Sequence, residues 1–251
     1  MKSLYDTWIM AKRSLRHTTR SIDTIITVLA LPIFSMLMIV YVFGYAINVG
    51  SVKYIDYIVP GVIILTVVSG ISYAAFRLNL DVSKGFINRF RSMPVTPSSI
   101  LGGHVTSSVL SNLFSVLMVM IVALMVGFRS PANLAAWLAF FGILLLFTTA
   151  LTWLAMFFGL LAKSAEGASV FSYILMFMVV ISSAFTATEK MSPVLRGFAQ
   201  NQPMTPIIET MRSLLINGKT GPYVLIALGW CTIILAISYA AALWAYKNRT
   251  T

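Results

Sequence analysis

Very few side chains in this sequence could perform chemistry together. The 251 residues include two histidines, one cysteine and seven acidic residues. His17 and His104 fall on different predicted loops, and Cys231 lies inside an apolar stretch, so no cluster has the spacing of a metal site or a catalytic triad. His104 follows Gly102 and Gly103. We expect it to lie at the membrane interface, at the start of the third predicted transmembrane helix, rather than to act as a general base. The sequence therefore predicts neither an enzyme nor a bound metal.

One short segment imitates a phosphate-binding loop. Gly218, Lys219 and Thr220 match the end of the pattern G-x-x-x-x-G-K-[ST]. Ser213 stands where that pattern needs its first glycine, and the segment lies at the end of a predicted helix. We therefore expect no nucleotide or other cofactor to be bound by this chain itself.

The composition is that of a membrane protein. Hydrophobic residues make up 59% of the chain and charged residues 10%, with a mean hydropathy of +0.89, whereas soluble domains average roughly 45–50% apolar and about 25% charged residues. Lys and Arg number 18 against 7 acidic residues, which gives a net charge of +11. Since no polar segment is long enough for a nucleic-acid-binding domain, we expect this charge to meet anionic lipid or an acidic partner.

Six apolar runs have the length of a transmembrane helix, which needs about 20 residues. None of these runs contains a charged residue, and they are continuous rather than alternating, which favours helices over a β-barrel. The sequence predicts an all-α, polytopic membrane protein with one transmembrane domain over residues 1–251. The six predicted transmembrane helices are residues 25–47, 57–76, 105–126, 134–161, 168–187 and 222–245.

The positive charges predict the orientation of these helices. Twelve of the 18 Lys and Arg residues fall on the side of the two termini, and six fall on the other side. The positive-inside rule therefore places both termini in the cytoplasm. We expect the membrane to be the plasma membrane of a prokaryotic cell. Transporters that use ion gradients usually keep ionisable groups inside their spans. Because these spans have none, we expect the energy source to lie outside the chain.

The first 22 residues form a predicted amphipathic helix in the plane of the membrane. Such a helix can be a simple basic anchor, or a platform that also contacts a cytoplasmic partner. Its defining apolar and basic side chains are Leu4, Trp8, Arg13, Leu15, Arg16 and Arg20.

Residues 77–103 form the longest predicted cytoplasmic loop, with a short helix over 82–93. Pro94 prevents the helix from continuing. Its aromatic residues could fold back on the membrane, or they could fill a groove on a cytoplasmic protein with Arg89 and Arg91 at the rim. The apolar face of this helix is formed by Val82, Phe86, Phe90 and Met93.

Residues 188–221 are predicted to lie outside and to contain a second short helix. Thr205 is the expected N-cap with Pro206 at the first helical position, and Glu209 and Arg212 are spaced to form an ion pair. Asn217 and Gly218 are expected to end the helix. This helix is too short to cross the membrane, so we expect it to lie on or dip into the outer leaflet as a lid.

The order of these elements, together with two segments, resembles the membrane subunits of type-2 ABC exporters, particularly drug-export permeases of the daunorubicin-resistance type. The segments are GFINRFRSMPVTPSSILGGHV (residues 85–105) and NQPMTPIIETMRSLL (residues 201–215). The resemblance implies a dimer of permeases with twelve spans, bound to two copies of a cytoplasmic ABC ATPase. It also implies that ATP and magnesium are bound by the ATPase and that substrate passes between the two permeases.

The resemblance also assigns roles to three sets of residues. The coupling helix, which docks on the ATPase, corresponds to Gly85, Phe86, Arg89, Phe90, Arg91, Met93 and Pro94. The N-terminal amphipathic segment corresponds to the interface helix of the family. The short re-entrant helices that close the outer end correspond to Gln202, Pro203, Thr205, Pro206, Glu209 and Arg212.

The uncharged, methionine-rich spans favour an apolar or amphiphilic cargo such as a drug, a lipid or a peptide. A polysaccharide or glycolipid exporter would share the same architecture. A gradient-driven carrier, a membrane-embedded enzyme and a passive assembly subunit are three rival classes of polytopic protein. In the exporter, we expect closure of the ATPases to move residues 82–93 as a lever that tilts the first, second and fifth spans.

Overall fold

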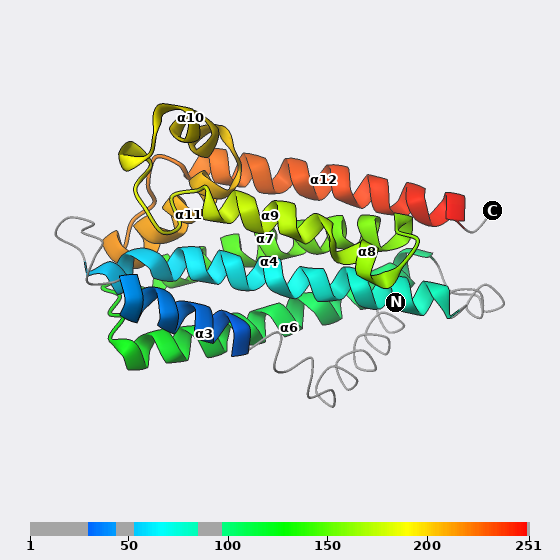
Figure 1. The fold of residues 1–251 in the computed structure, drawn as a ribbon, viewed down its shortest axis with the longest axis horizontal. Coiled ribbons are helices and arrows are strands. Elements are labelled where there is room, and N and C mark those ends of the chain that lie inside the picture. The colour runs from blue at the N-terminus through cyan, green and yellow to red at the C-terminus, as the bar shows by residue number, and fades with distance from the viewer. Residues whose placement is uncertain (1–29, 44–52, 85–96, 250–251) are drawn as a thin grey trace.

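A computed structural model describes residues 30–43, 53–84 and 97–249, and every regular element in these residues is a helix. Figure 1 shows the long helices lying side by side along one axis. In chain order the elements are α3 (Leu31–Met38), the π-helical η2 (Ile39–Phe43), α4 (Tyr54–Ser83), α6 (Pro97–Val126), α7 (Leu134–Leu161), α8 (Ala165–Ser169), α9 (Phe171–Val180), the 3-10 turn η3 (Thr188–Lys190), α10 (Pro193–Asn201), α11 (Met204–Arg212), the π-helical η4 (Ser213–Asn217) and α12 (Val224–Arg249).

Four of these helices are long and apolar enough to cross a membrane. They coincide with four of the six predicted spans, and α7 has the predicted bounds. The first predicted span, residues 25–47, is described only between residues 30 and 43, where α3 and η2 form a shorter apolar helix. The membrane-spanning helices in the described residues are Tyr54–Ser83, Leu101–Val126, Leu134–Leu161 and Val224–Asn248.

The fifth predicted span, residues 168–187, does not form one helix. The helix starts earlier, in α8, and ends at Val180, after which the chain continues in turns. Ser182 explains the break: its hydroxyl donates to the Val179 carbonyl at 2.6 Å and accepts from the Ala184 backbone N–H at 3.1 Å. These short-range bonds replace helical ones, which is the usual way serine competes with a helix. The prediction of a continuous helix to residue 187 is therefore wrong.

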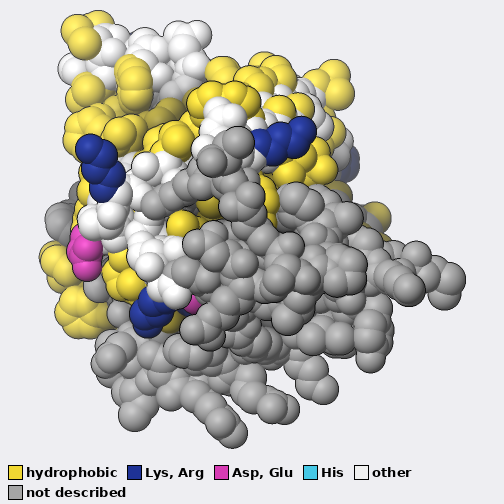
Figure 2. Space-filling model, turned by 90° about the vertical axis from the view of Figure 1, so that its right-hand side faces the viewer, with side chains coloured by type: hydrophobic (Ala, Val, Ile, Leu, Met, Phe, Trp, Pro, Cys, Tyr) yellow, Lys and Arg dark blue, Asp and Glu magenta, His cyan; other side chains and the backbone are white. Residues whose placement is uncertain are grey.

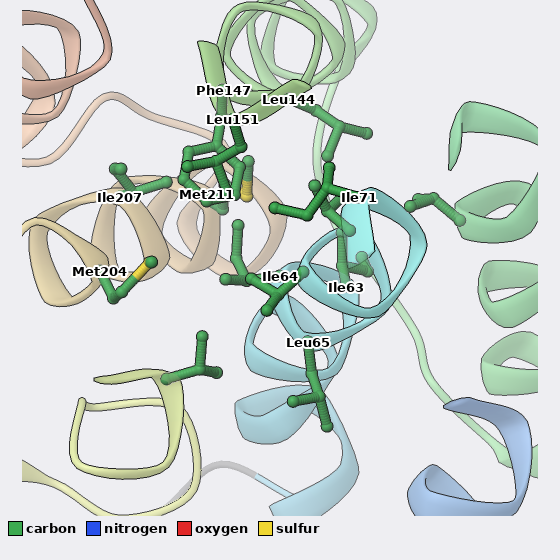
Figure 3. Packing of buried hydrophobic residues seen from close by; sticks show 14 of the residues in the cluster. Ile63, Ile64, Leu65, Ile71, Leu144, Phe147, Leu151, Met204, Ile207 and Met211 are labelled. Atoms are coloured by element: carbon green, nitrogen blue, oxygen red, sulfur yellow. The ribbon is translucent and has the colours of Figure 1, made fainter. Parts of the chain in front are cut away.

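α4 is the central helix of the bundle and is buried along most of its length. It packs against α6, α7, α9 and α11, while α12 packs mainly on α7 (Figure 1). Figure 3 shows side chains of α4, α7 and α11 meeting in one core, so α11 lies inside the bundle. The core residues labelled there on these three helices are Ile63, Ile64, Leu65, Ile71, Leu144, Phe147, Leu151, Met204, Ile207 and Met211.

The outer faces of the long helices are apolar and exposed. Phe114 on α6, Phe141 on α7, Phe177 on α9 and Ile237 on α12 are all more than two-fifths exposed. Exposed apolar surface on this scale is unfavourable in water and suits the hydrocarbon of a bilayer. The described part of the chain is thus a multi-pass membrane protein.

The two ends of the bundle differ. At one end α4, α7 and α12 finish, and Figure 2 shows separate Lys and Arg side chains there among hydrophobic ones. We call it the α8 end, and Asn79 and Asp81 of α4 lie close to it. At the opposite end, which we call the α11 end, the chain folds back through α10 and α11 (Figure 1).

The extension of α4 beyond the predicted residue 76 depends on a buried amide. The Asn79 side chain donates to the carbonyl oxygens of Gly159 at 3.0 Å and Ala162 at 2.7 Å. These are carbonyls at the C-terminal end of α7, which has no further helical N–H groups to bond them. His104 of α6 also lies 3.5 Å from Asp81, so α4, α6 and α7 are tied together at the α8 end.

Small residues allow the central helices to approach closely. A Cβ atom on Gly70 would overlap the Asn112 side chain of α6, and one on Gly159 would lie 2.9 Å from the Ala75 carbonyl oxygen of α4. The sequence leaves open whether these small residues serve contacts within the chain or between chains. In the structure both glycines pack within the chain.

Leucine at Gly159 should destabilise the bundle by about 1–3 kcal/mol, because the added side chain would push α7 away from α4. Gly142 is the matched control on the same helix, since a Cβ atom there meets nothing within 4 Å. Thermal unfolding of the purified protein in detergent should show a lower melting temperature for Gly159→Leu and an unchanged one for Gly142→Leu. Equal melting temperatures for the two variants would contradict this packing.

Candidate functional site

Two of the three predicted sets of functional residues lie outside the described residues. The coupling residues between Gly85 and Pro94 and the interface-helix residues between Leu4 and Arg20 both fall in segments that the structure does not describe. Their roles stay predictions. The described chain does show what borders the coupling segment, because α4 ends at Ser83 on one side of it and α6 begins at Pro97 on the other.

The third set, predicted to close one end of the pathway, lies just before α11 and along its length. Gln202 and Pro203 precede the helix, and the other four residues lie within it. The helix begins at Met204, so the residue that precedes it is Pro203, and Thr205 already lies inside the helix. The prediction of Thr205 as N-cap is therefore wrong. Pro206 falls in the first turn, where its missing N–H breaks no helical hydrogen bond.

Of the two positions expected for this helix, on a leaflet or dipping into it, its burial in the bundle fits the second. All but one residue of α11 is buried, and the helix contacts α4, α9 and α12. Its apolar face, which includes Ile207 and Met211, meets α4 and α7 in the core of Figure 3. Its polar residues find partners elsewhere in the bundle, so both faces of the helix can be buried.

Arg212 is the central polar residue of this region. Its side chain is only 8% exposed. Its Nε atom donates to the Tyr57 carbonyl oxygen at 3.0 Å, and its Nη2 atom donates to the carbonyl oxygens of Ser183 at 2.7 Å and Ala184 at 3.5 Å. One guanidinium group on α11 therefore bonds both α4 and the turn that follows α9.

Two further contacts balance the charge of Arg212. Its Nη1 atom donates to the carboxylate of Glu209, one turn earlier on α11, as the three-residue spacing predicts. Its Cζ atom also lies 3.7 Å from the centre of the Tyr57 ring, which is a close cation–π contact. Burial of an unpaired arginine in a membrane domain is highly unfavourable, so these contacts make its position possible.

The end of α9 supplies carbonyl groups that need donors. Gln202 donates from Nε2 to the carbonyl oxygens of Met178 at 2.7 Å and Ile181 at 3.2 Å. The Tyr57 hydroxyl donates to the Ser183 carbonyl oxygen at 3.1 Å. A helix that ends inside an apolar bundle must have its last carbonyls bonded in this way. The break after Val180 and the polar residues of α11 thus depend on each other.

The same junction is tightly packed. Gly61 of α4 faces Ala184, and a Cβ atom at Gly61 would lie 2.7 Å from the Cβ atom of Ala184. Only glycine lets the turn approach α4 so closely, and this approach brings the Ser183 and Ala184 carbonyls within reach of Arg212. We refer to Arg212, Glu209, Tyr57, Ser183 and Ala184 as the Arg212 cluster.

The far side of α11 is also held in place. Ser130, in the connection between α6 and α7, donates to the Leu215 carbonyl oxygen of η4 at 2.6 Å. Gly218 then ends η4 with a left-handed conformation (φ +64°), as expected for the residue after Asn217. The Asp56 carboxylate accepts from the Arg129 backbone N–H at 3.1 Å, which ties the same connection to the start of α4.

Sequence reasoning identified the α11 residues of this site but missed their partners. Tyr57 was only the first residue of a predicted span, and Ser183 and Ala184 lay within another. The available signal is the adjacent pair Ser182 and Ser183 near the end of the predicted span. Among the described residues no group of three or more His, Cys, Asp or Glu side chains could hold a metal ion. In the described residues, the site holds helices together. Its side chains there are not arranged for covalent chemistry.

The fold and this site define a class: an all-helical, multi-pass membrane protein in which a short helix folds back into the bundle between the last two long segments. The chain belongs to the ABC-2 type transporter family, whose sequence model matches residues 5–216. It is also 26% identical over 198 residues to the daunorubicin resistance ABC transporter permease protein DrrB1 of Streptomyces coeruleorubidus. That alignment covers 78% of this chain and 70% of that protein.

Family membership establishes the general role of the chain. It is a membrane permease subunit of an ABC transporter, and such a subunit has no ATPase activity of its own. ABC-2 permeases pair with ABC ATPase subunits, which handle the ATP. The resemblance found in the sequence is thereby confirmed at the level of the family.

Alanine at Gln202 should destabilise the α9–α11 junction by about 1–3 kcal/mol, because two buried carbonyls would lose their donor. Gln200, an exposed residue of α10, is the matched control. In hydrogen–deuterium exchange, Gln202→Ala should speed exchange in residues 178–185, and Gln200→Ala should leave it unchanged. Unchanged exchange in Gln202→Ala would show that these hydrogen bonds do not hold the junction.

Proposed function

We propose that this chain forms one half of the export pathway of an ATP-driven ABC exporter for an apolar or amphiphilic substrate such as a drug, a lipid or a peptide. A second permease, either another copy or a related chain, forms the other half. A separate cytoplasmic ATPase binds ATP and magnesium and supplies the energy. The observation that carries the proposal is membership of the ABC-2 family together with the similarity to a daunorubicin resistance permease.

The character of the bundle supports an apolar or amphiphilic cargo. The interior around α4 is lined by aliphatic and methionine side chains, and the charge of Arg212 is matched by Glu209. Flexible methionine side chains can adapt to substrates of different shape. An exporter of polysaccharide or glycolipid is the alternative with the same architecture, and transport assays with the two kinds of substrate distinguish them.

The proposal places the α8 end in the cytoplasm and the α11 end outside, with both termini cytoplasmic in a prokaryotic plasma membrane. In this orientation the coupling helix at residues 82–93 faces the ATPase, and the amphipathic helix at residues 1–22 lies at the cytoplasmic surface. Residues 188–221 then close the pathway on the outside. The excess of Lys and Arg on the side of the termini supports this arrangement.

α4 connects the two ends of the bundle and can transmit a movement from one to the other. It runs without interruption from Tyr57 in the Arg212 cluster to Ser83 beside the coupling segment, a rise of about 39 Å at 1.5 Å per residue. A displacement of the coupling segment by the ATPase acts first on the ends of α4 and α6. Because α4 contacts α7, α9 and α11 in the described bundle, its tilt changes the packing at the outer end.

The double substitution Phe86→Ala and Phe90→Ala should abolish both ATPase association and coupled export, because it removes the aromatic side chains that fill the groove on the ATPase. Co-purification in mild detergent and export from membrane vesicles measure the two effects. Membrane insertion should be unchanged.

The matched control is the double substitution Phe114→Ala and Phe141→Ala, which removes two exposed phenylalanines from α6 and α7. This control should keep the ATPase bound. Export and co-purification that survive Phe86→Ala with Phe90→Ala would contradict the coupling role. Substrate movement in liposomes without any ATPase would instead favour a gradient-driven carrier.

The orientation can be tested in a Cys231→Ala background, which removes the one native thiol. Lys219 at the α11 end and Glu166 at the α8 end are both exposed. In intact cells, a membrane-impermeant maleimide should label Lys219→Cys at once and should label Glu166→Cys only after the cells are permeabilised. The reverse pattern would contradict the proposed orientation.

A further inference from the structure

We propose that Arg212 is a releasable brace: it holds α11 closed against α4 and the end of α9, and its contacts are broken and remade in each export cycle. The inference rests on the proposed function and adds a positioning residue and a moving part to it. Arg212 is not argued to contact the cargo. It acts by fixing where α11 sits.

The Arg212 guanidinium group reaches several parts of the chain at once. Its three nitrogen atoms bond three separate segments: the Tyr57 carbonyl on α4, the Glu209 carboxylate on α11, and the Ser183 and Ala184 carbonyls after α9. A planar group with donors in a fixed fork holds such partners in one geometry, which a lysine cannot do. Arg212 therefore sets the relative position of three segments at once.

The partners of Arg212 on the α9 side can be released by the guanidinium group. Arg212 bonds carbonyl oxygens of a turn, and these oxygens are not committed to a helix. The Tyr57 hydroxyl also donates to the Ser183 carbonyl oxygen, so that oxygen keeps one donor when the guanidinium moves away. Glu209 stays beside Arg212 because both are on α11, so the charge pair can travel with the helix. Movement of α11 would then never leave an unpaired charge in the bundle.

The closed arrangement leaves polar atoms unbonded on both sides of the junction. Five buried side-chain atoms in the described residues have no hydrogen-bond partner, and three of them lie here: the Ser183 hydroxyl, the Gln202 Oε1 atom and the Thr205 hydroxyl. The other two, Asn112 Oδ1 and the Thr148 hydroxyl, lie on α6 and α7. Buried polar atoms of this kind are rare in native structures, and each needs an explanation. The three at the junction lie on the turn after α9 and around the start of α11, the two segments that would shift. A second position of α11 in which these atoms are bonded would explain all three.

The Glu209–Arg212 pair lies close to the surface of the bundle. The Glu209 side chain is 29% exposed while that of Arg212 is 8% exposed, so the pair lies at the border between the bundle and its surroundings. A small shift of α11 would carry the charge pair toward water, where both ions are better solvated. The ion pair of the Arg212 cluster can therefore reach water by a small movement. An ion pair deep in the bundle could not.

The experiment uses the complex of this chain with its co-purified ATPase, carrying Cys231→Ala and Ser183→Cys. Ser183 is suitable because its side chain is buried and makes no hydrogen bond in the described structure, so the substitution removes no hydrogen bond. The probe is a water-soluble maleimide, applied without nucleotide and after trapping with ATP and vanadate. Gln200→Cys on α10 is the exposed control.

We expect the thiol introduced by Ser183→Cys to react slowly without nucleotide and about tenfold faster or more in the trapped state. Adding Arg212→Gln should give the fast rate in both states, with ATPase association retained, and Arg212→Lys should be intermediate. Glu209→Gln removes the countercharge and should also speed labelling without nucleotide, because the buried guanidinium group is then left without a charged partner. Gln200→Cys should react at one rate throughout. The nucleotide-dependent rate with Arg212 intact is the readout that a purely structural role of Arg212 would not produce.

Three results would overturn the proposal. The first is slow labelling of Ser183→Cys in both nucleotide states while the ATPase stays bound. The second is a nucleotide-dependent rate that Arg212→Gln leaves unchanged. The third is a chain that binds no ATPase at all, which overturns the proposed function and this inference together. If the Arg212→Gln variant does not fold, the proposal can still be tested. The labelling rates of Ser183→Cys are then compared in the two nucleotide states, with Arg212 intact and with Arg212→Lys.

Discussion

The burial of one arginine in an otherwise apolar bundle constrains the whole α11 end of this protein. Arg212 can be buried only because Glu209, the Tyr57 ring and three carbonyl groups surround it. Those carbonyls are within reach because α9 ends early and because Gly61 lets the following turn approach α4. The break in α9, the glycine on α4 and the burial of α11 are therefore parts of one arrangement. Removal of any of them would leave a charge or several carbonyl groups without partners in a membrane domain.

The central helix α4 connects this arrangement to the opposite end of the molecule. Near Tyr57 it contributes to the Arg212 cluster, and near Asn79 and Asp81 it is bonded to α7 and α6. The α8 end is thus firmly tied in the described residues, while the α11 end leaves several polar atoms unbonded. A helix that is bonded to its neighbours at one end and held at the other by a cluster around one arginine suits a permease driven by a separate ATPase. In our proposal, force enters at the α8 end and changes the packing at the α11 end.

The sequence predicts the long helices well because twenty apolar residues in a row have few other stable forms. It also predicts the pairing of Glu209 with Arg212 and the helix end at Gly218, since both depend on spacing along the chain. It does not predict the break at Ser182, and it leaves open whether α11 lies on a leaflet or dips into it. The break involves local hydrogen bonds of the Ser182 hydroxyl, but both features also depend on partners more than twenty residues away, such as the bond between Gln202 and Met178, which local sequence patterns do not reveal. The helix at residues 82–93 lies almost entirely outside the described residues and stays a prediction.

The most direct test is a pair of structures of the assembled complex, one without nucleotide and one with ATP bound. The quantity to compare is the distance from Arg212 Cζ to the centre of the Tyr57 ring, which is 3.7 Å here. The account predicts a short distance without nucleotide and a lost contact with ATP, with Glu209 still paired to Arg212. A distance that stays the same in both states while the outer end opens would contradict it.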